Sequence, residues 1–135
     1  MTLRTWMILS WVALPSVMFG GFSLLRLLNR GDVLSPYQVR CFRAGHAHAG
    51  VLTVLSLVYQ MSIATTRLSA AATNAACAIL FVGILAQAGG FFLHMFVGRE
   101  GQPSAGTRLT MLGAVLLALA VAILVYGMVW LPAPA

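Results

Sequence analysis

Residues 75–97 read AACAILFVGILAQAGGFFLHMFV and contain no acidic or basic residue apart from one histidine. A helix needs about 20 predominantly apolar residues to cross the hydrocarbon core of a bilayer. The stretch therefore predicts a membrane-spanning helix near Ala75–Val97. Only 7% of the 135 residues are charged and 61% are hydrophobic, whereas a soluble domain carries about 25% charged residues. The composition places the whole chain in the membrane class.

Three more uncharged runs are long enough to span a membrane: Thr5–Leu25, Ala44–Thr66 and Leu109–Ala135. Short connections between them make consecutive helices antiparallel neighbours. We therefore expect one all-α transmembrane domain over residues 1–135, an integral membrane four-helix antiparallel bundle with up-down-up-down order. The predicted helices are about 6–28, 41–66, 71–97 and 108–131.

The distribution of arginines predicts how the chain is oriented in the membrane. All eight basic residues are arginines; six flank the first and third loops, and two lie at the other face: Arg26, Arg30, Arg40, Arg43, Arg99 and Arg108 against Arg4 and Arg67. By the positive-inside rule, loops one and three are cytoplasmic and both termini lie outside. We expect a multi-pass protein of the inner or plasma membrane. Anionic lipid headgroups account for the net charge of +6, and nucleic acid is excluded because no soluble surface presents that charge.

The segment FRAGHAHAGV at residues 42–51 contains two of the three histidines, His46 and His48. A separation of two residues is about 200° around a helix, so the two rings point to opposite faces and do not chelate one ion together. One imidazole is free to reach a cofactor while the other meets a neighbour. The third histidine, His94, lies at the same level, because His48 and His94 are each five residues from an arginine on the same membrane face.

Haem suits such a site, since it is flat, apolar and held by as little as one axial histidine. Gly50 beside the pair, and Gly90 about one turn before His94, leave room for a porphyrin. The alternative is that histidines near helix ends lie at the membrane interface and bind nothing. Gln87 is either a further group of the site or an interhelical hydrogen-bond partner.

Several other residues are expected to serve packing. Tyr59, Gln60 and Asn74 lie toward the other leaflet and are assigned to packing or to the aromatic belt. Cys41 and Cys77 lack the spacing of a metal site or of a disulfide, and we expect them to serve as small apolar packing residues. A stripe of small residues at four-residue spacing favours a close helix contact: Ala114, Ala118 and Ala122.

Three short segments resemble the styrene oxide isomerases, which are small four-helix membrane proteins. Residues 43–50, RAGHAHAG, are similar to an Arg-Ala-His-Ser-Gly stretch that opens the second helix of that family. Residues 14–21, LPSVMFGG, are similar in weaker form, and residues 90–93, GFFL, look like a Gly-Phe-Tyr-Leu segment in the third helix. The resemblance extends over most of the chain, through motifs of low individual specificity.

This resemblance implies haem b bound between the subunits of a trimer, with a histidine of the second helix as axial ligand. His48, followed by Ala49 and Gly50, best matches the family motif and is the expected iron ligand; His46 is the second choice. The implied reaction is a Meinwald rearrangement of a small apolar epoxide. Ferric iron acts as a Lewis acid on the epoxide oxygen, and a hydride shift gives an aldehyde.

Two positions depart from the family pattern. The family's tyrosine falls on Phe92 and its asparagine on Val54, and neither replacement donates a hydrogen bond. His94 has no counterpart in the family. As a second axial ligand it would close the iron to substrate. The alternatives to an epoxide isomerase are therefore a bis-histidine haem protein for electron transfer, haem handling or sensing, and a structural subunit of a membrane complex.

Overall fold

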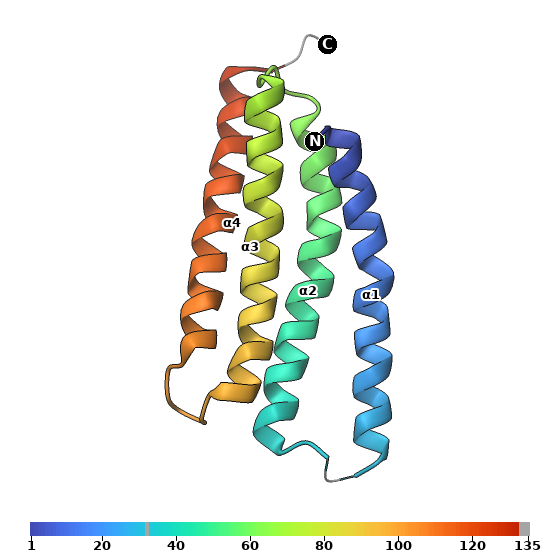
Figure 1. Ribbon diagram of the computed structural model, residues 1–135. Helices are drawn as coiled ribbons and strands as arrows, with labels where there is room; N and C mark the ends of the chain where they lie inside the picture. The colour runs from blue at the N-terminus through green and yellow to red at the C-terminus, as the bar shows by residue number, and fades with distance from the viewer. Residues whose placement is uncertain (32, 133–135) are drawn as a thin grey trace.

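A computed structural model describes residues 1–31 and 33–132 as four antiparallel α-helices (Figure 1). Helix α1 spans Leu3–Asn29, α2 spans Pro36–Ile63, α3 spans Ala70–Val97 and α4 spans Ala105–Trp130. Apart from two isolated bridges in the turns, these residues form no β-structure. The all-α architecture with up-down-up-down order that the sequence predicts is present.

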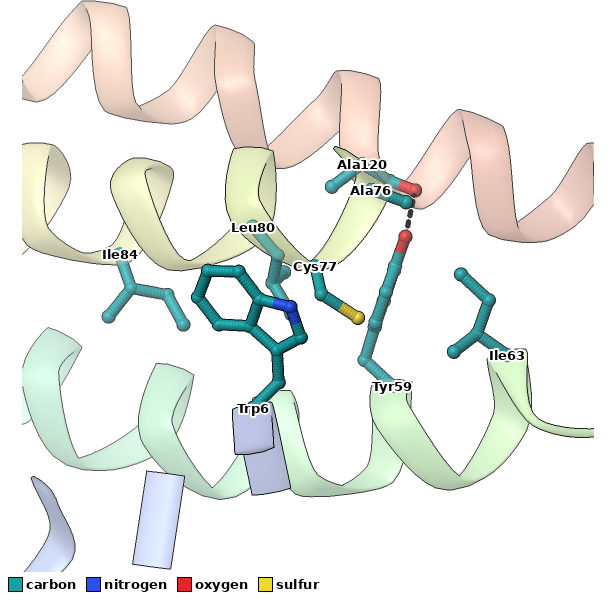
Figure 2. Packing of buried hydrophobic residues seen from close by; sticks show 8 residues of the cluster. All are labelled: Trp6, Tyr59, Ile63, Ala76, Cys77, Leu80, Ile84 and Ala120. Carbon is teal, nitrogen blue, oxygen red and sulfur yellow. Dashed lines mark hydrogen bonds between the residues drawn. The ribbon is translucent and has the colours of Figure 1, made fainter. Parts of the chain in front are cut away.

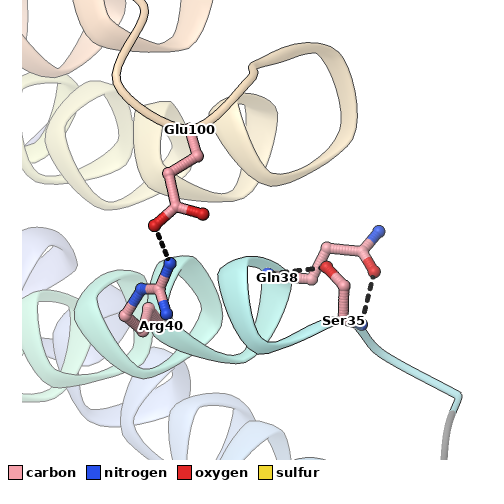
Figure 3. Close-up of polar contacts among 4 residues, drawn as sticks. All are labelled: Ser35, Gln38, Arg40 and Glu100. Atoms are coloured by element: carbon pink, nitrogen blue, oxygen red, sulfur yellow. Dashed lines mark hydrogen bonds and ion pairs between the residues drawn. The ribbon is translucent and has the colours of Figure 1, made fainter.

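All four helices begin before their predicted first residues, and helix caps explain the difference for α2 and α4. Helix α2 begins at Pro36 instead of residue 41, because Ser35 and Gln38 form a reciprocal capping box (Figure 3) and the proline occupies the first turn. Helix α4 begins at Ala105 instead of residue 108, since Ser104 caps its first turn in the same manner. The polar ends of both helices extend beyond the apolar runs from which they were predicted.

Helices α1, α3 and α4 are long and apolar enough to cross a membrane. Helix α2, which the sequence also predicts as a span, is not in this set. It is as long as α3, with 28 residues, but it carries two arginines near its start and several polar residues along its length. Its buried polar side chains are Thr53, Ser56 and Gln60.

The four helices form a curved row rather than a closed bundle. Consecutive helices pack on one another, and α2 and α3 make smaller contacts with α4 and α1, respectively. Within the described residues, α1 and α4 do not touch. Along the helix axes, the start of α1 and the end of α4 lie at one end of the molecule, and the loops after α1 and α3 lie at the other (Figure 1). We call the second end the arginine-rich end.

The hydrophobic core lies in the half of the molecule near the termini (Figure 2). There the Tyr59 hydroxyl donates a 2.8 Å hydrogen bond to the carbonyl of Ala120, and Trp6 Nε1 donates a 2.9 Å bond to Asn74 Oδ1. The packing roles predicted for Tyr59 and Asn74 are confirmed. The core cluster comprises Trp6, Tyr59, Ile63, Ala76, Cys77, Leu80, Ile84 and Ala120. Both cysteines are buried and free.

The closest helix contact, between α3 and α4, is made by small residues seven positions apart. On α4 the buried residues of this contact are Gly106, Gly113 and Ala120. Gly127, seven positions further on, is also buried but faces Thr66 and Leu68, just before α3. A Cβ at Gly113 would overlap the backbone of Gln87. The predicted stripe of Ala114, Ala118 and Ala122 lies instead on the exposed side of α4. Small residues do bring this helix close to its neighbour, but a different set of them faces α3.

Candidate functional site

The three histidines lie in the half of the molecule toward the arginine-rich end, and each has different neighbours. His46 and His48 lie on different sides of α2, as their spacing requires. His46 contacts α1, whereas His48 lies against Phe91 of α3. His94 contacts the start of α4. In the part of the chain that the structure describes, no three His, Cys, Asp or Glu residues are grouped to hold a metal ion.

The imidazole of His46 fills the space left by two glycines of α1. A Cβ at Gly21 would lie 2.8 Å from Nε2 of His46, and a Cβ at Gly20 would lie 3.5 Å from Nδ1. Such contact leaves no room for a macrocycle at Nε2. The side chain of His46 is therefore part of the packing between α1 and α2.

The ring of His48 is oriented by a backbone carbonyl of its own helix. Its Nδ1 lies 2.8 Å from the carbonyl oxygen of Ala44, one turn earlier. A carbonyl only accepts, so Nδ1 carries the hydrogen in the neutral ring and Nε2 keeps its lone pair. This bond to a carbonyl is the kind that orients metal-bound histidines. The ring centroid lies 4.7 Å from that of Phe91, and the side chain borders an open groove of about 200 Å³ with Ala47, Val51 and Leu52.

The side chain and the backbone carbonyl of His94 connect three helix ends. Its Nδ1 lies 2.6 Å from Oγ of Ser104, the N-cap of α4, and Ser104 Oγ also accepts from the amide of Gly106. The hydroxyl of Tyr37, in the first turn of α2, donates a 3.0 Å bond to the His94 carbonyl. The Tyr37 and His94 rings meet edge-on with centroids 5.6 Å apart. His94 thus joins the end of α3 to the starts of α2 and α4.

An ion pair between Arg40 of α2 and Glu100 of the third loop lies at the same end (Figure 3). Both side chains are mostly exposed, so the pair contributes little to stability. Together with the Tyr37 and Ser104 contacts, it places the loop between α3 and α4 beside the start of α2.

The two glycines predicted to border a cofactor face neighbouring helices. A Cβ at Gly90 would overlap Thr110 of α4, so the contact between α3 and α4 requires this glycine. A Cβ at Gly50 would make an ordinary 3.7 Å contact with Val17 of α1. Gly90 of α3 faces α4 and Gly50 of α2 faces α1, so neither borders the groove at His48, and we assign both to helix packing.

The positions at which the chain departs from the isomerase pattern are separated in space. Val54 is 49% exposed on the outer side of α2. The ring of Phe92 packs edge-on against Phe42, with centroids 5.2 Å apart, and lines a cavity between α1, α2 and α3. Neither side chain approaches His48 from the side of its groove.

Sequence reasoning missed a buried polar network between α1 and α2. Ser10 Oγ accepts hydrogen bonds from Ser56 Oγ at 2.8 Å and from Gln60 Nε2 at 3.0 Å. Gln60 is 1% exposed, and its Oε1 has no partner in the described chain. Oε1 of Gln87 is likewise unpartnered there, so the interhelical bond considered for Gln87 is not made. The sequence signal for the network was the spacing of Thr53, Ser56 and Gln60, three to four residues apart on one helix face.

Comparison with known protein families, curated proteins and solved structures found no match to this chain. The resemblance to styrene oxide isomerases therefore rests on the short sequence motifs alone.

Proposed function

We propose that this chain is a four-span membrane protein that binds haem b through His48 and isomerises a small apolar epoxide. The observation that carries the proposal is the environment of His48. Its Nδ1 is held by the Ala44 carbonyl, and its Nε2 is the free ring nitrogen beside an apolar groove. Haem needs one such axial ligand.

The burial pattern of α2 supports its assignment as the fourth span. The buried positions in its second half include the polar residues Thr53, Ser56 and Gln60. Its exposed side chains from the middle onward are apolar: Val51, Val54, Leu55, Val58 and Met61. The helix presents an apolar surface outward, and its polar groups lower the average hydropathy without facing lipid. With four spans, the arginine-rich end is cytoplasmic by the positive-inside rule.

Each residue around His48 contributes to haem binding in a different way. His48 supplies the axial nitrogen, and Phe91 supports the back of its ring. The exposed apolar side chains of Ala47 and Val51 give a surface for the macrocycle, and Arg43, one turn nearer the cytoplasmic face, neutralises its carboxylates. Because the groove at His48 is open and only about 200 Å³ in volume, a second copy of the chain covers the other side of the haem. This agrees with the trimer that the resemblance implies.

The environment of His94 favours an isomerase over a bis-histidine electron carrier. His94 borders a pocket with Phe91, Thr107, Thr110 and Met111 rather than the groove of His48, so within one chain it does not face an iron bound in that groove. Ferric haem with one coordination position open to substrate supplies a Lewis acid that polarises an epoxide oxygen. Apolar side chains of the groove, together with the second copy that covers it, exclude water from this position. Since Val54 and Phe92 donate no hydrogen bond, apolar contacts orient the substrate.

The test combines haem content with activity. We expect protein purified from haem-replete cells to show a Soret band and to convert styrene oxide to phenylacetaldehyde. His48→Ala should lose both, whereas His46→Ala, the matched control two residues away, should keep haem. Absence of a Soret band in the wild-type protein would refute haem binding and with it the proposal. Loss of haem in His46→Ala with retention in His48→Ala would overturn the ligand assignment. A haem-loaded protein without isomerase activity would refute the proposed reaction alone.

A further inference from the structure

A cavity of about 300 Å³ lies between α1, α2 and α3, on a different face of α2 from His48. Small residues from the three helices create the space: Ala13, Ala49, Ala88 and Gly89. The rings of Phe81 and Phe92 also line it. Its lining includes Leu85, which is largely exposed on α3, so molecules dissolved in the surrounding apolar phase have lateral access.

The wall of this cavity contains an unpaired hydroxyl. Three hydroxyl-bearing residues line it, Ser16, Thr53 and Ser56. The hydrogen of Ser56 is used within the protein, on Ser10 Oγ or on the Thr53 carbonyl at 2.7 Å. Neither Ser16 nor Thr53 forms a side-chain hydrogen bond to a described residue; Ser16 is exposed, whereas Thr53 is 5% exposed and lies in the buried part of the wall. An unpaired hydroxyl in an apolar setting carries a free-energy cost that a suitable occupant relieves.

We propose that this cavity binds an uncharged one-ring aromatic molecule with a single acceptor oxygen, as in an aryl ketone, and that Thr53 donates the hydrogen bond. A cavity of 150 Å³ accommodates benzene, and ligand pockets begin at about 300 Å³. The volume therefore suits a substituted ring and excludes a macrocycle. Phe81 and Phe92 offer aromatic contacts to the ring. A lipid acyl chain fills the same volume but leaves Thr53 unpaired. The inference goes beyond the haem site and does not depend on it.

Two substitutions separate filling of the cavity from loss of the hydrogen bond. A Cβ at Gly89 meets no atom within 4 Å, so Gly89→Leu fills the cavity without a backbone clash. Thr53→Val keeps the shape and removes the hydroxyl. Ala118→Leu, on the exposed side of α4, adds the same apolar bulk elsewhere and serves as the control. The probes are para-fluoroacetophenone and para-ethylfluorobenzene, which have similar shapes and differ in the acceptor oxygen.

Fluorine NMR of each probe, with protein in lipid nanodiscs, gives the readout. We expect saturable binding of the ketone to wild type, Ala118→Leu and the haem ligand variant His48→Ala, and no binding to Gly89→Leu. Thr53→Val should lower the affinity for the ketone about 2–10-fold, as loss of one neutral hydrogen bond does, and leave the affinity for the hydrocarbon unchanged. Nuclear Overhauser contacts between the bound ketone and the phenylalanine rings locate it in wild-type protein, independently of any variant.

Non-saturable partitioning that is equal in wild type and Gly89→Leu would overturn the proposal. So would equal affinity for the two probes with no effect of Thr53→Val, because the cavity would then be an apolar void that acyl chains fill.

Discussion

The two imidazoles of the HAH segment lie on different sides of α2 and have different roles. His46 occupies the space above Gly20 and Gly21, whereas His48 keeps Nε2 free beside a groove. The division follows from the 3.6-residue period of the helix, and the sequence alone predicts it. The bond between His94 and Ser104 was not predictable, because it depends on how the loop between α3 and α4 closes, and no periodic pattern encodes that closure.

The contact between His46 and Gly21 predicts a specific coupling. Gly21→Ala places a methyl group 2.8 Å from Nε2 of His46, so we expect it to destabilise the protein by about 1–3 kcal/mol, the usual cost of overpacking. In a His46→Ala background the same change should cost little stability, because removal of the imidazole leaves space for the added methyl group. A double-mutant cycle on thermal or denaturant unfolding in detergent measures this coupling. Additive effects would show that the two residues do not share a contact.

At the scale of whole helices, the packing of α3 against α4 shows what a sequence pattern leaves open. Helix α4 carries two stripes of small residues, and periodicity alone cannot decide which one meets a neighbour. The buried stripe is the one whose seven-residue spacing matches Gly83 and Gly90 on α3. The same limit applies to the start of α2, which lies outside the apolar run and depends on the cap formed by Ser35 and Gln38.

Two glycine-to-alanine substitutions test the α3–α4 contact with the same added methyl group. Gly113→Ala would overlap the backbone of Gln87, and we expect a loss of about 1–3 kcal/mol or more, with separation of the two helices. Gly89→Ala meets open space and should be neutral or stabilising by up to about 1 kcal/mol, since alanine favours the helix. Unfolding midpoints in detergent give the comparison. Equal destabilisation by both substitutions would contradict the close contact.

At the scale of the whole molecule, the curved row has two unlike halves. The half near the termini holds the large apolar cluster, whereas the histidine half holds the groove at His48. Exposed apolar side chains occur in both halves, among them Trp130 in the first and Phe19 in the second. The sequence predicts four antiparallel helices from their apolar runs. It does not predict that α1 and α4 stay apart, because an open row and a closed bundle need the same spans. An open row fits a protein whose site is completed by a second copy of itself.

The central claim is that His48 is the only protein ligand of a bound haem iron. The ferric electron paramagnetic resonance spectrum of the haem-loaded wild-type protein in nanodiscs tests it most directly. We predict a high-spin signal, from iron with one histidine and an open or water-ligated sixth position, that is unchanged in His94→Ala and absent in His48→Ala. A low-spin bis-histidine signal that becomes high-spin in His94→Ala would contradict the account.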